Sequence, residues 1–111
     1  MIRRLHQNSG RAAISRVCDA HRKWVRGHAC SVPGCDNRRI EAAHVRVGTD
    51  GGTGLKPSDR FVIPLCGEHH AHQHNISEQR FEQLYRINMA DIAAELARKS
   101  PHLPKLTGVE E

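Results

Sequence analysis

The segment PLCGEHHAHQH, residues 64–74, constrains the fold of this chain more than any other feature, because it crowds metal-ligand side chains into a short space. It contains four of the nine histidines and one of the four cysteines. Thiolates and imidazoles bind zinc at about 2.0–2.3 Å, and a bound ion can organise a small domain around itself. The segment can therefore form a structural zinc site, a catalytic metal site, both at once, or a polar helix that is rich in histidine.

The composition favours a fold that a metal stabilises. The chain has 111 residues, which we assign to a single domain over residues 1–100 and a flexible tail over 101–111. It contains one Trp, one Tyr and two Phe, and large rings supply much of the buried area in small cores. Since the apolar core is expected to be thin, a bound ion is one source of the missing stability.

The net charge of +5, counted with neutral histidines, favours an anionic partner, and nucleic acid is the commonest one. The alternative is a basic surface that only keeps the chain soluble. No apolar run approaches the length of a membrane span, and the N-terminus MIRRLHQNSG lacks the apolar stretch of a secretory signal. We therefore expect a cytoplasmic protein without a membrane partner, in which cysteines stay reduced and are available as metal ligands.

Hydrophobic periodicity and capping residues predict an α+β domain. The predicted elements are a helix over 11–26, strands over 38–48 and 60–66, a helix from Gly67 through the histidines, a helix capped by Ser77, and a helix from Asn88 to about Lys99. The two strands can pair as a hairpin around the loop between them, which is rich in Gly and Pro.

Two residues of the first predicted helix, Cys18 and His21, fall on its apolar stripe. This position predicts that they pack in the core rather than bind metal. Asn8 or Ser9 can cap the start of this helix, and Gly27 suits its end.

Two short-spaced pairs of metal-ligand residues predict a zinc site. Cys30 and Cys35 flank a Pro-Gly turn, and Cys66 and His69 form a C-x-x-H pair where a strand should pass into a helix. If the fold brings the pairs together, three thiolates and one imidazole make a closed tetrahedral site, which is typical of structural zinc. The alternative is that these are small buried cysteines without a metal.

A second metal site is predicted on another face of the same helix. His70 and His74 stand at i and i+4, a spacing that lets two imidazoles bind one ion and leaves coordination positions open for water and phosphate. Open positions are what a catalytic ion needs. The alternative is that these histidines only pack or form hydrogen bonds. His72 points elsewhere, closer to the face of His69, and receives no role.

The combined pattern C-x4-C … EAAHVRVG … GGTGLKPSD … IPLC-x2-HH-x3-H, within residues 28–76, resembles the HNH endonucleases, also called ββα-metal nucleases. It is most similar to small prophage-associated members with a structural zinc knot. The resemblance implies an antiparallel hairpin and a helix around one divalent ion. Together with the elements predicted above, this gives an α+β fold in which one helix precedes this ββα-metal core and two helices follow it. It implies a metal-dependent DNA endonuclease of a bacterial or phage-infected cell, which hydrolyses phosphodiester bonds to 5′-phosphate and 3′-hydroxyl products.

The resemblance assigns roles to the residues that match the motif. His44 matches the general base, which activates water for attack on a phosphodiester. His70 and His74 match ligands of the catalytic ion, which would be Mg²⁺, Mn²⁺ or a similar divalent ion. The zinc knot matches four residues, which are Cys30, Cys35, Cys66 and His69.

Two positions depart from the family pattern. Ala43 stands where many members have an Asp or His that binds the ion, and Phe61 stands where they have a central Asn. Asp59 is the nearest polar candidate, and it could either complete the ion site or orient His44. We include Asp59 among the catalytic residues and the ion ligands. Glu41 ranks low, because strand alternation points it away from His44.

Candidate phosphate contacts are the basic residues near the motif, and the alternative for each is a solvated surface charge. They are Lys56, Arg46, Arg38 and Arg39, with Arg16, Arg22, Lys23 and Arg26 on the basic face of the first helix. A competing function is a non-catalytic zinc module that binds DNA or a protein partner, which the departure at Ala43 favours. A third is a toxin or interaction domain of a larger assembly.

Overall fold

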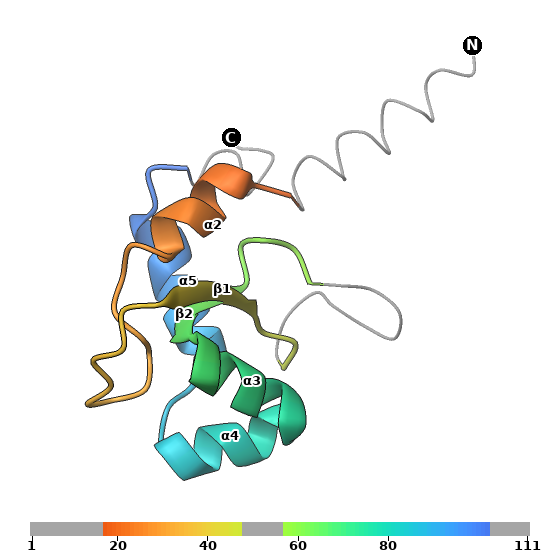
Figure 1. Ribbon diagram of the computed structural model, residues 1–111. Helices are drawn as coiled ribbons and strands as arrows, with labels where there is room; N and C mark the ends of the chain where they lie inside the picture. Colours follow the sequence, from red (N-terminus) through yellow and green to blue (C-terminus); the bar gives the residue numbers. More distant parts are fainter. Residues whose placement is uncertain (1–16, 48–56, 103–111) are drawn as a thin grey trace.

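The computed structural model describes residues 17–47 and 57–102, and this part of the chain combines one antiparallel hairpin with four helices. The elements follow the predicted order (Figure 1): α2 Asp19–Val25, β1 Ile40–His44, β2 Val62–Cys66, α3 Gly67–Asn75, α4 Glu78–Tyr85 and α5 Met89–Lys99. The predicted α+β class and hairpin are confirmed. Within the described residues, no helix has both the length and the apolar character needed to cross a membrane.

The hairpin is the centre of the fold. Its register opposes Ile40 to Cys66 and His44 to Val62, so the start of β1 lies beside the point where β2 passes into α3. Every residue of β2 is buried, whereas β1 is only partly buried. A strand that is buried along its whole length needs cover on both faces.

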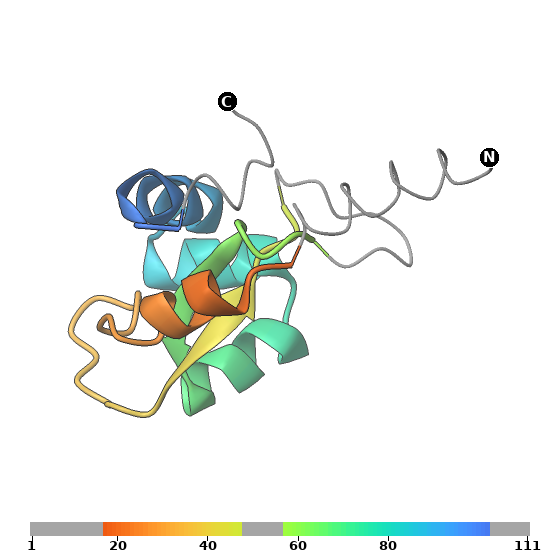
Figure 2. The same ribbon diagram turned by 90° about the horizontal axis from the view of Figure 1, so that it is seen from above.

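Helices supply that cover. One buried cluster joins the hairpin to α4 and α5 through Phe81 and Met89, and a second joins it to α2 and α5 through Val25 and Leu96. Figure 1 shows the hairpin between α2 on one side and α3 with α4 on the other. Figure 2, seen from above, shows α5 alongside the hairpin. The scaffold therefore fixes α2 and α3 relative to β1.

Local capping residues begin the three C-terminal helices. Ser77 and Asn88 accept hydrogen bonds from backbone amides in the first turns of α4 and α5, as the sequence predicts. The sulfur of Cys66 does the same for α3, where it accepts from the amide of His69. The junction between β2 and α3 thus holds a sulfur that is both a helix cap and a candidate metal ligand.

The predicted helix over 11–26 is wrong in its extent. Val17 and Cys18 are not helical, and α2 begins at Asp19. The amide of Cys18 donates a 2.7 Å hydrogen bond to a carboxylate oxygen of Asp59, and this long-range bond takes the donor that a continuous helix would use within itself. The predicted caps Asn8 and Ser9, like residues 11–16, lie outside the described residues.

Cys18 and His21 are both buried, as their positions on the predicted apolar stripe indicate. Cys18, just before the helix, is 6% exposed, and His21 is fully buried. His21 stacks on Trp24, and its Nδ1 lies 2.9 Å from the hydroxyl of Ser100 at the end of α5. His21 is therefore part of the interior of the domain.

Both strands are shorter than predicted. β1 ends at His44. The amide of Val45 still donates to the carbonyl of Phe61, but the amides of Arg46 and Val47 donate to the carboxylate of Glu78 at 3.1 and 2.8 Å. A side chain of α4 therefore takes over from β2 as the partner of the chain. β2 begins at Val62 rather than at residue 60. Most of the predicted loop, residues 48–56, and the tail from residue 103 lie outside the described residues.

The outer edge of β2 is closed at its midpoint. The carbonyl of Pro64 accepts hydrogen bonds from both the amide and the hydroxyl of Ser31, each at 2.8 Å. These bonds tie the loop between α2 and β1 to β2, and they bring Cys30 close to the end of that strand.

Candidate functional site

The two predicted pairs of metal-ligand residues come together in the fold. The ligand atoms of Cys30, Cys35, Cys66 and His69, here called the Cys3His cluster, all lie within 4.8 Å of one another. Two come from the loop between α2 and β1, one ends β2, and one lies in the first turn of α3. Among the residues that the structure describes, no other group of three or more His, Cys, Asp or Glu ligand atoms meets this spacing. The predicted convergence of these four residues is confirmed.

The spacing inside the Cys3His cluster fits a tetrahedral ion. The sulfurs of Cys35 and Cys66 lie 3.9 Å apart, and Nδ1 of His69 lies 3.2 Å from the Cys66 sulfur and 3.5 Å from that of Cys30. Bonds of about 2.3 Å to sulfur and about 2.1 Å to nitrogen imply ligand separations of about 3.5–3.8 Å. The four residues could hold a metal ion, and their chemistry is consistent with structural zinc.

Backbone amides support the sulfurs of this cluster. The amide of Cys66 lies 3.4 Å from the Cys30 sulfur, and the amide of His69 lies 3.5 Å from the Cys66 sulfur. Such donors stabilise negative charge, so they favour the thiolate form that a metal requires. All four cysteines of the chain lie in its described part, and none of them forms a disulfide.

His72 lies on the same side of α3 as His69, as predicted. Its Nδ1 is 2.8 Å from the hydroxyl of Tyr85, and its ring packs against Phe81. The ring of Tyr85 also packs edge-on against His69, with the ring centroids 5.1 Å apart. These contacts give His72 a packing role between α3 and α4.

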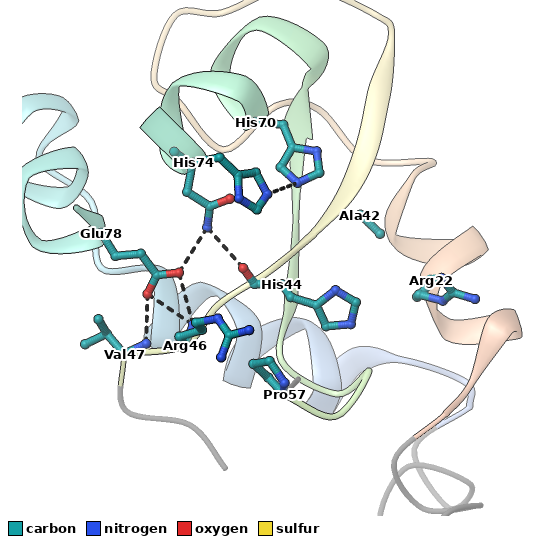
Figure 3. Close-up of a pocket in the computed structure, with 10 residues that line it drawn as sticks. Arg22, Ala42, His44, Arg46, Val47, Pro57, His70, His74 and Glu78 are labelled. Carbon is teal, nitrogen blue, oxygen red and sulfur yellow. Dashed lines mark hydrogen bonds between the residues drawn. The ribbon is translucent and has the colours of Figure 1, made fainter. Parts of the chain in front are cut away.

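Another face of α3 borders a pocket of about 900 Å³ (Figure 3). His44 projects into it from β1, and His70 and His74 project into it from α3. Its wall also includes Arg22 of α2, Arg46, and Glu78 of α4. The structure therefore brings together all three predicted catalytic histidines around one open volume.

His70 and His74 have the geometry of a chelating pair. Their Nε2 atoms lie 3.2 Å apart, and Figure 3 shows the two rings side by side on α3. Two nitrogens bonded at about 2.1 Å to one ion, at an angle near about 100°, lie about 3.2 Å apart. The pair could hold an ion whose remaining coordination positions face the pocket.

Glu41 contacts His70, although sequence reasoning ranked it low. Its Oε1 lies 2.6 Å from Nδ1 of His70. The low rank considered only the direction of Glu41 relative to His44. The signal that could have found it is the hairpin register, which puts Ile40 opposite Cys66 and therefore Glu41 beside the first turn of α3.

Asp59 holds the imidazole of His44. Its Oδ1 lies 2.8 Å from Nε2 of His44, and its Oδ2 accepts from the amide of Cys18 and lies 3.2 Å from Nε of Arg22. The Asp59 residue is only 6% exposed. If Nε2 carries the hydrogen that Asp59 accepts, the lone pair of the ring is on Nδ1. Of the two roles predicted for Asp59, this geometry favours the orientation of His44.

The ion-ligand role predicted for Asp59 has no support in this arrangement. Within the described residues, its oxygens do not gather within 4.8 Å of the ring nitrogens of His70 and His74. The physical reason is that the start of α2 anchors the carboxylate, through the Cys18 amide and the Arg22 guanidinium.

A polar clamp made by Gln73 and Glu78 fixes the end of β1. Nε2 of Gln73 donates to the carbonyl of His44 at 3.1 Å and to Glu78 at 3.3 Å, and Glu78 in turn accepts from the amide of Arg46. Gln73 is 4% exposed. Sequence reasoning missed both residues, because a Gln among histidines and a Glu in a first helical turn are ordinary surface patterns.

Neither of the two positions that depart from the family pattern lines the pocket. Ala43 is fully buried in the core, whereas its neighbour Ala42 lines the pocket. Phe61 continues the hairpin, since its carbonyl accepts a 2.8 Å hydrogen bond from the amide of Val45.

The predicted phosphate contacts divide by position. Arg46 and Arg22 line the pocket, whereas Arg38 and Arg39 are exposed just before β1. Lys23 and Arg26 are exposed on or just after α2, and Lys56 and Arg16 lie outside the described residues.

Comparison with known proteins gives one family. A family model described as "Protein of unknown function (DUF968)" matches residues 13–99. No curated protein and no solved structure matches the chain. Since the family model covers well over half of the sequence, the chain belongs to the DUF968 family.

Proposed function

We propose that this chain is a metal-dependent DNA endonuclease of the HNH, or ββα-metal, type. The observation that carries the proposal is the meeting of His44 with His70 and His74 around one pocket on a hairpin-and-helix scaffold. A base and a pair of ion ligands on one open volume are what hydrolysis of a phosphodiester requires.

We assign structural zinc to the Cys3His cluster. Its four ligands form a closed set with tetrahedral spacing in a partly buried position, which suits an ion that stabilises the fold. The cluster joins the loop before β1, the end of β2 and the start of α3, so it holds the elements that frame the pocket.

In the proposed reaction Asp59 keeps His44 in the tautomer with Nε2 protonated, and Nδ1 of His44 takes the proton from the attacking water. His70 and His74 would hold a divalent ion through their Nε2 atoms. When bound, that ion supplies electrostatic stabilisation of the phosphate and of the leaving 3′ oxygen. The products are a 5′-phosphate and a 3′-hydroxyl.

DNA is the proposed substrate because the pocket lies among basic residues of a chain with net charge +5. Arg22 and Arg46 line the pocket and can contact the phosphates beside the bond that is cut.

The proposal is tested by nicking of supercoiled plasmid, with zinc-loaded protein and added Mg²⁺, Mn²⁺ or Ni²⁺. We expect ion-dependent nicking, reduced about 100- to 10,000-fold in His44→Ala. His102→Ala is the matched control, since it removes a histidine that does not line the pocket. Unchanged cutting by His44→Ala, with fold and zinc content preserved, would remove His44 as the base.

A second candidate is a non-catalytic zinc module that binds DNA or a protein partner. The observation that favours it is the fully buried Ala43, which leaves the pocket without the ligand that many HNH proteins place there. It predicts binding without cutting under every ion tried, so the same plasmid experiment separates the two.

A further inference from the structure

The hairpin register places Glu41 at the foot of α3. Ile40 pairs with Cys66, the last residue of β2, and the amide of Gly67 donates to the carbonyl of Arg39 at 3.2 Å. A Cβ atom at Gly67 would lie 3.4 Å from Oε2 of Glu41, so the carboxylate lies over the first residue of the helix. The strand and the helix that follows it thus bring an acidic group to the histidine face of α3.

The carboxylate contacts only one of the two ring nitrogens of His70. Oε1 of Glu41 lies 2.6 Å from Nδ1, a length typical of a strong hydrogen bond between a carboxylate and an imidazole N–H. A proton held on Nδ1 leaves the lone pair on Nε2, and Nε2 is the atom that faces His74 at 3.2 Å.

We propose that Glu41 is a positioning residue, which sets the tautomer and orientation of His70 for a divalent ion bound between His70 and His74. The inference rests on the proposed function, because it assumes the ion site of that function. Carboxylates behind ligating histidines fix the tautomer and raise the basicity of the ligand, and their removal weakens metal binding by about 10- to 100-fold. Two imidazole donors further favour a transition metal such as Ni²⁺ or Zn²⁺ over Mg²⁺.

The contact between Glu41 and His70 contributes little to the stability of the fold. The Glu41 side chain is 55% exposed and that of His70 is 23% exposed, and pairs near the surface contribute little to folding. A role in ion binding therefore separates cleanly from a structural role, because only the ion affinity should change when the pair is broken.

The test is calorimetric titration of zinc-loaded protein with Ni²⁺, together with long-range ¹H–¹⁵N NMR of the His70 ring before the titration. Glu41→Ala should bind Ni²⁺ about 10- to 100-fold more weakly, with an unchanged melting temperature. Its His70 ring should lose the preference for Nδ1–H. Glu41→Gln retains a hydrogen-bond acceptor, so its Ni²⁺ affinity should lie between those of the wild type and Glu41→Ala. Glu68→Gln is the control, since it removes the same charge from an exposed position on α3.

Three results would contradict the inference, and the first two are distinguishable from failure of the ion site. If Glu41→Ala and the wild type bind Ni²⁺ equally and His70→Ala loses binding, the ion site stands but Glu41 has no role in it. Equal losses in Glu41→Gln and Glu68→Gln would show that charge alone matters. Unchanged Ni²⁺ affinity in both His70→Ala and His74→Ala would remove the ion site of the proposed function as well.

Discussion

The Cys3His cluster is a closed set of ligands, whereas the pocket lined by His44, His70 and His74 is open. The two sites nevertheless each take a residue from the same turn of α3, His69 for the cluster and His70 for the pocket. His69 belongs to a set of four ligand atoms within 4.8 Å of one another, whereas His70 has one imidazole partner, His74, and borders a pocket of about 900 Å³. Successive side chains on a helix diverge by about 100°, so one turn can serve two sites. A closed set of donors suits a metal that stabilises, and an open pair suits a metal that meets a substrate.

Cys35→Ser should have the largest effect of the substitutions considered, because it removes a ligand of the closed Cys3His cluster. Structural zinc contributes on the order of 10 kcal/mol, which is comparable to the whole stability of a small domain. We expect loss of zinc and of cooperative unfolding, measured with a chromogenic chelator and by circular dichroism. His74→Ala is the counterpart in the open site and should keep both properties. A Cys35→Ser protein that retains zinc and its melting temperature would contradict the assignment.

Asp59→Asn should affect the open site and the start of α2, and it should leave the Cys3His cluster intact. The amide can no longer accept from Nε2 of His44 with full negative charge, and loss of such a carboxylate lowers rates by about 100- to 10,000-fold. Plasmid nicking should fall while the zinc content stays at the wild-type level. Asp36→Asn removes the same charge from an exposed residue outside the pocket. If both variants cut DNA at the wild-type rate, Asp59 does not orient the base.

His21 is a histidine that neither site uses, and it should make stability depend on pH. Burial, with the nearby His102, lowers the pKa of His21 to about 4 from its usual value of 6.5. The unfolded chain therefore binds the proton first, so stability falls as the pH drops from about 6.5 toward about 4. The contribution between pH 7 and pH 5 is about 2 kcal/mol.

Denaturant unfolding at both pH values, for wild type and His21→Phe, measures this contribution. Between pH 7 and pH 5 we expect the wild type to lose that amount of unfolding free energy more than His21→Phe does. Protonation of the cysteines and histidines of the two sites affects both proteins alike, so it cancels. An unchanged difference would show that His21 titrates normally.

Ser77→Ala should cause the smallest loss of stability, and this loss should not favour one site over the other. Ser77 caps α4, the helix that supplies Tyr85 to the cluster side and Glu78 to the pocket side. Loss of a cap costs about 1 kcal/mol, measurable by urea unfolding, with zinc content and nicking retained. Gln79→Ala, an exposed change in the same turn, is the reference. A selective loss of one site would mean that α4 supports that site more than the other.

Local sequence patterns predicted most of the scaffold. The caps at Ser77 and Asn88, the alternation of β1 and the C-x-x-H pair depend on residues that are close in sequence. The convergence of Cys30 and Cys35 with that pair could also be predicted, because a tetrahedral ligand set requires four donors.

The contacts that complete the pocket depend on register and on helix packing. Glu41 reaches His70 because the last residue of β2 pairs with the first residue of β1, and Gln73 reaches the His44 carbonyl because α3 packs beside that strand. The start of α2 likewise depends on Asp59, which lies 41 positions from Cys18. No short-range pattern encodes these distances.

Pro64 has a consequence for the behaviour of the protein at high concentration. An exposed edge strand is a template on which a strand of another molecule can add, and continued addition leads to aggregation. At the midpoint of β2, the carbonyl already accepts two hydrogen bonds from Ser31, and the ring nitrogen has no hydrogen to donate. The outer edge of β2 is thereby closed at its midpoint to the addition of a strand from another molecule.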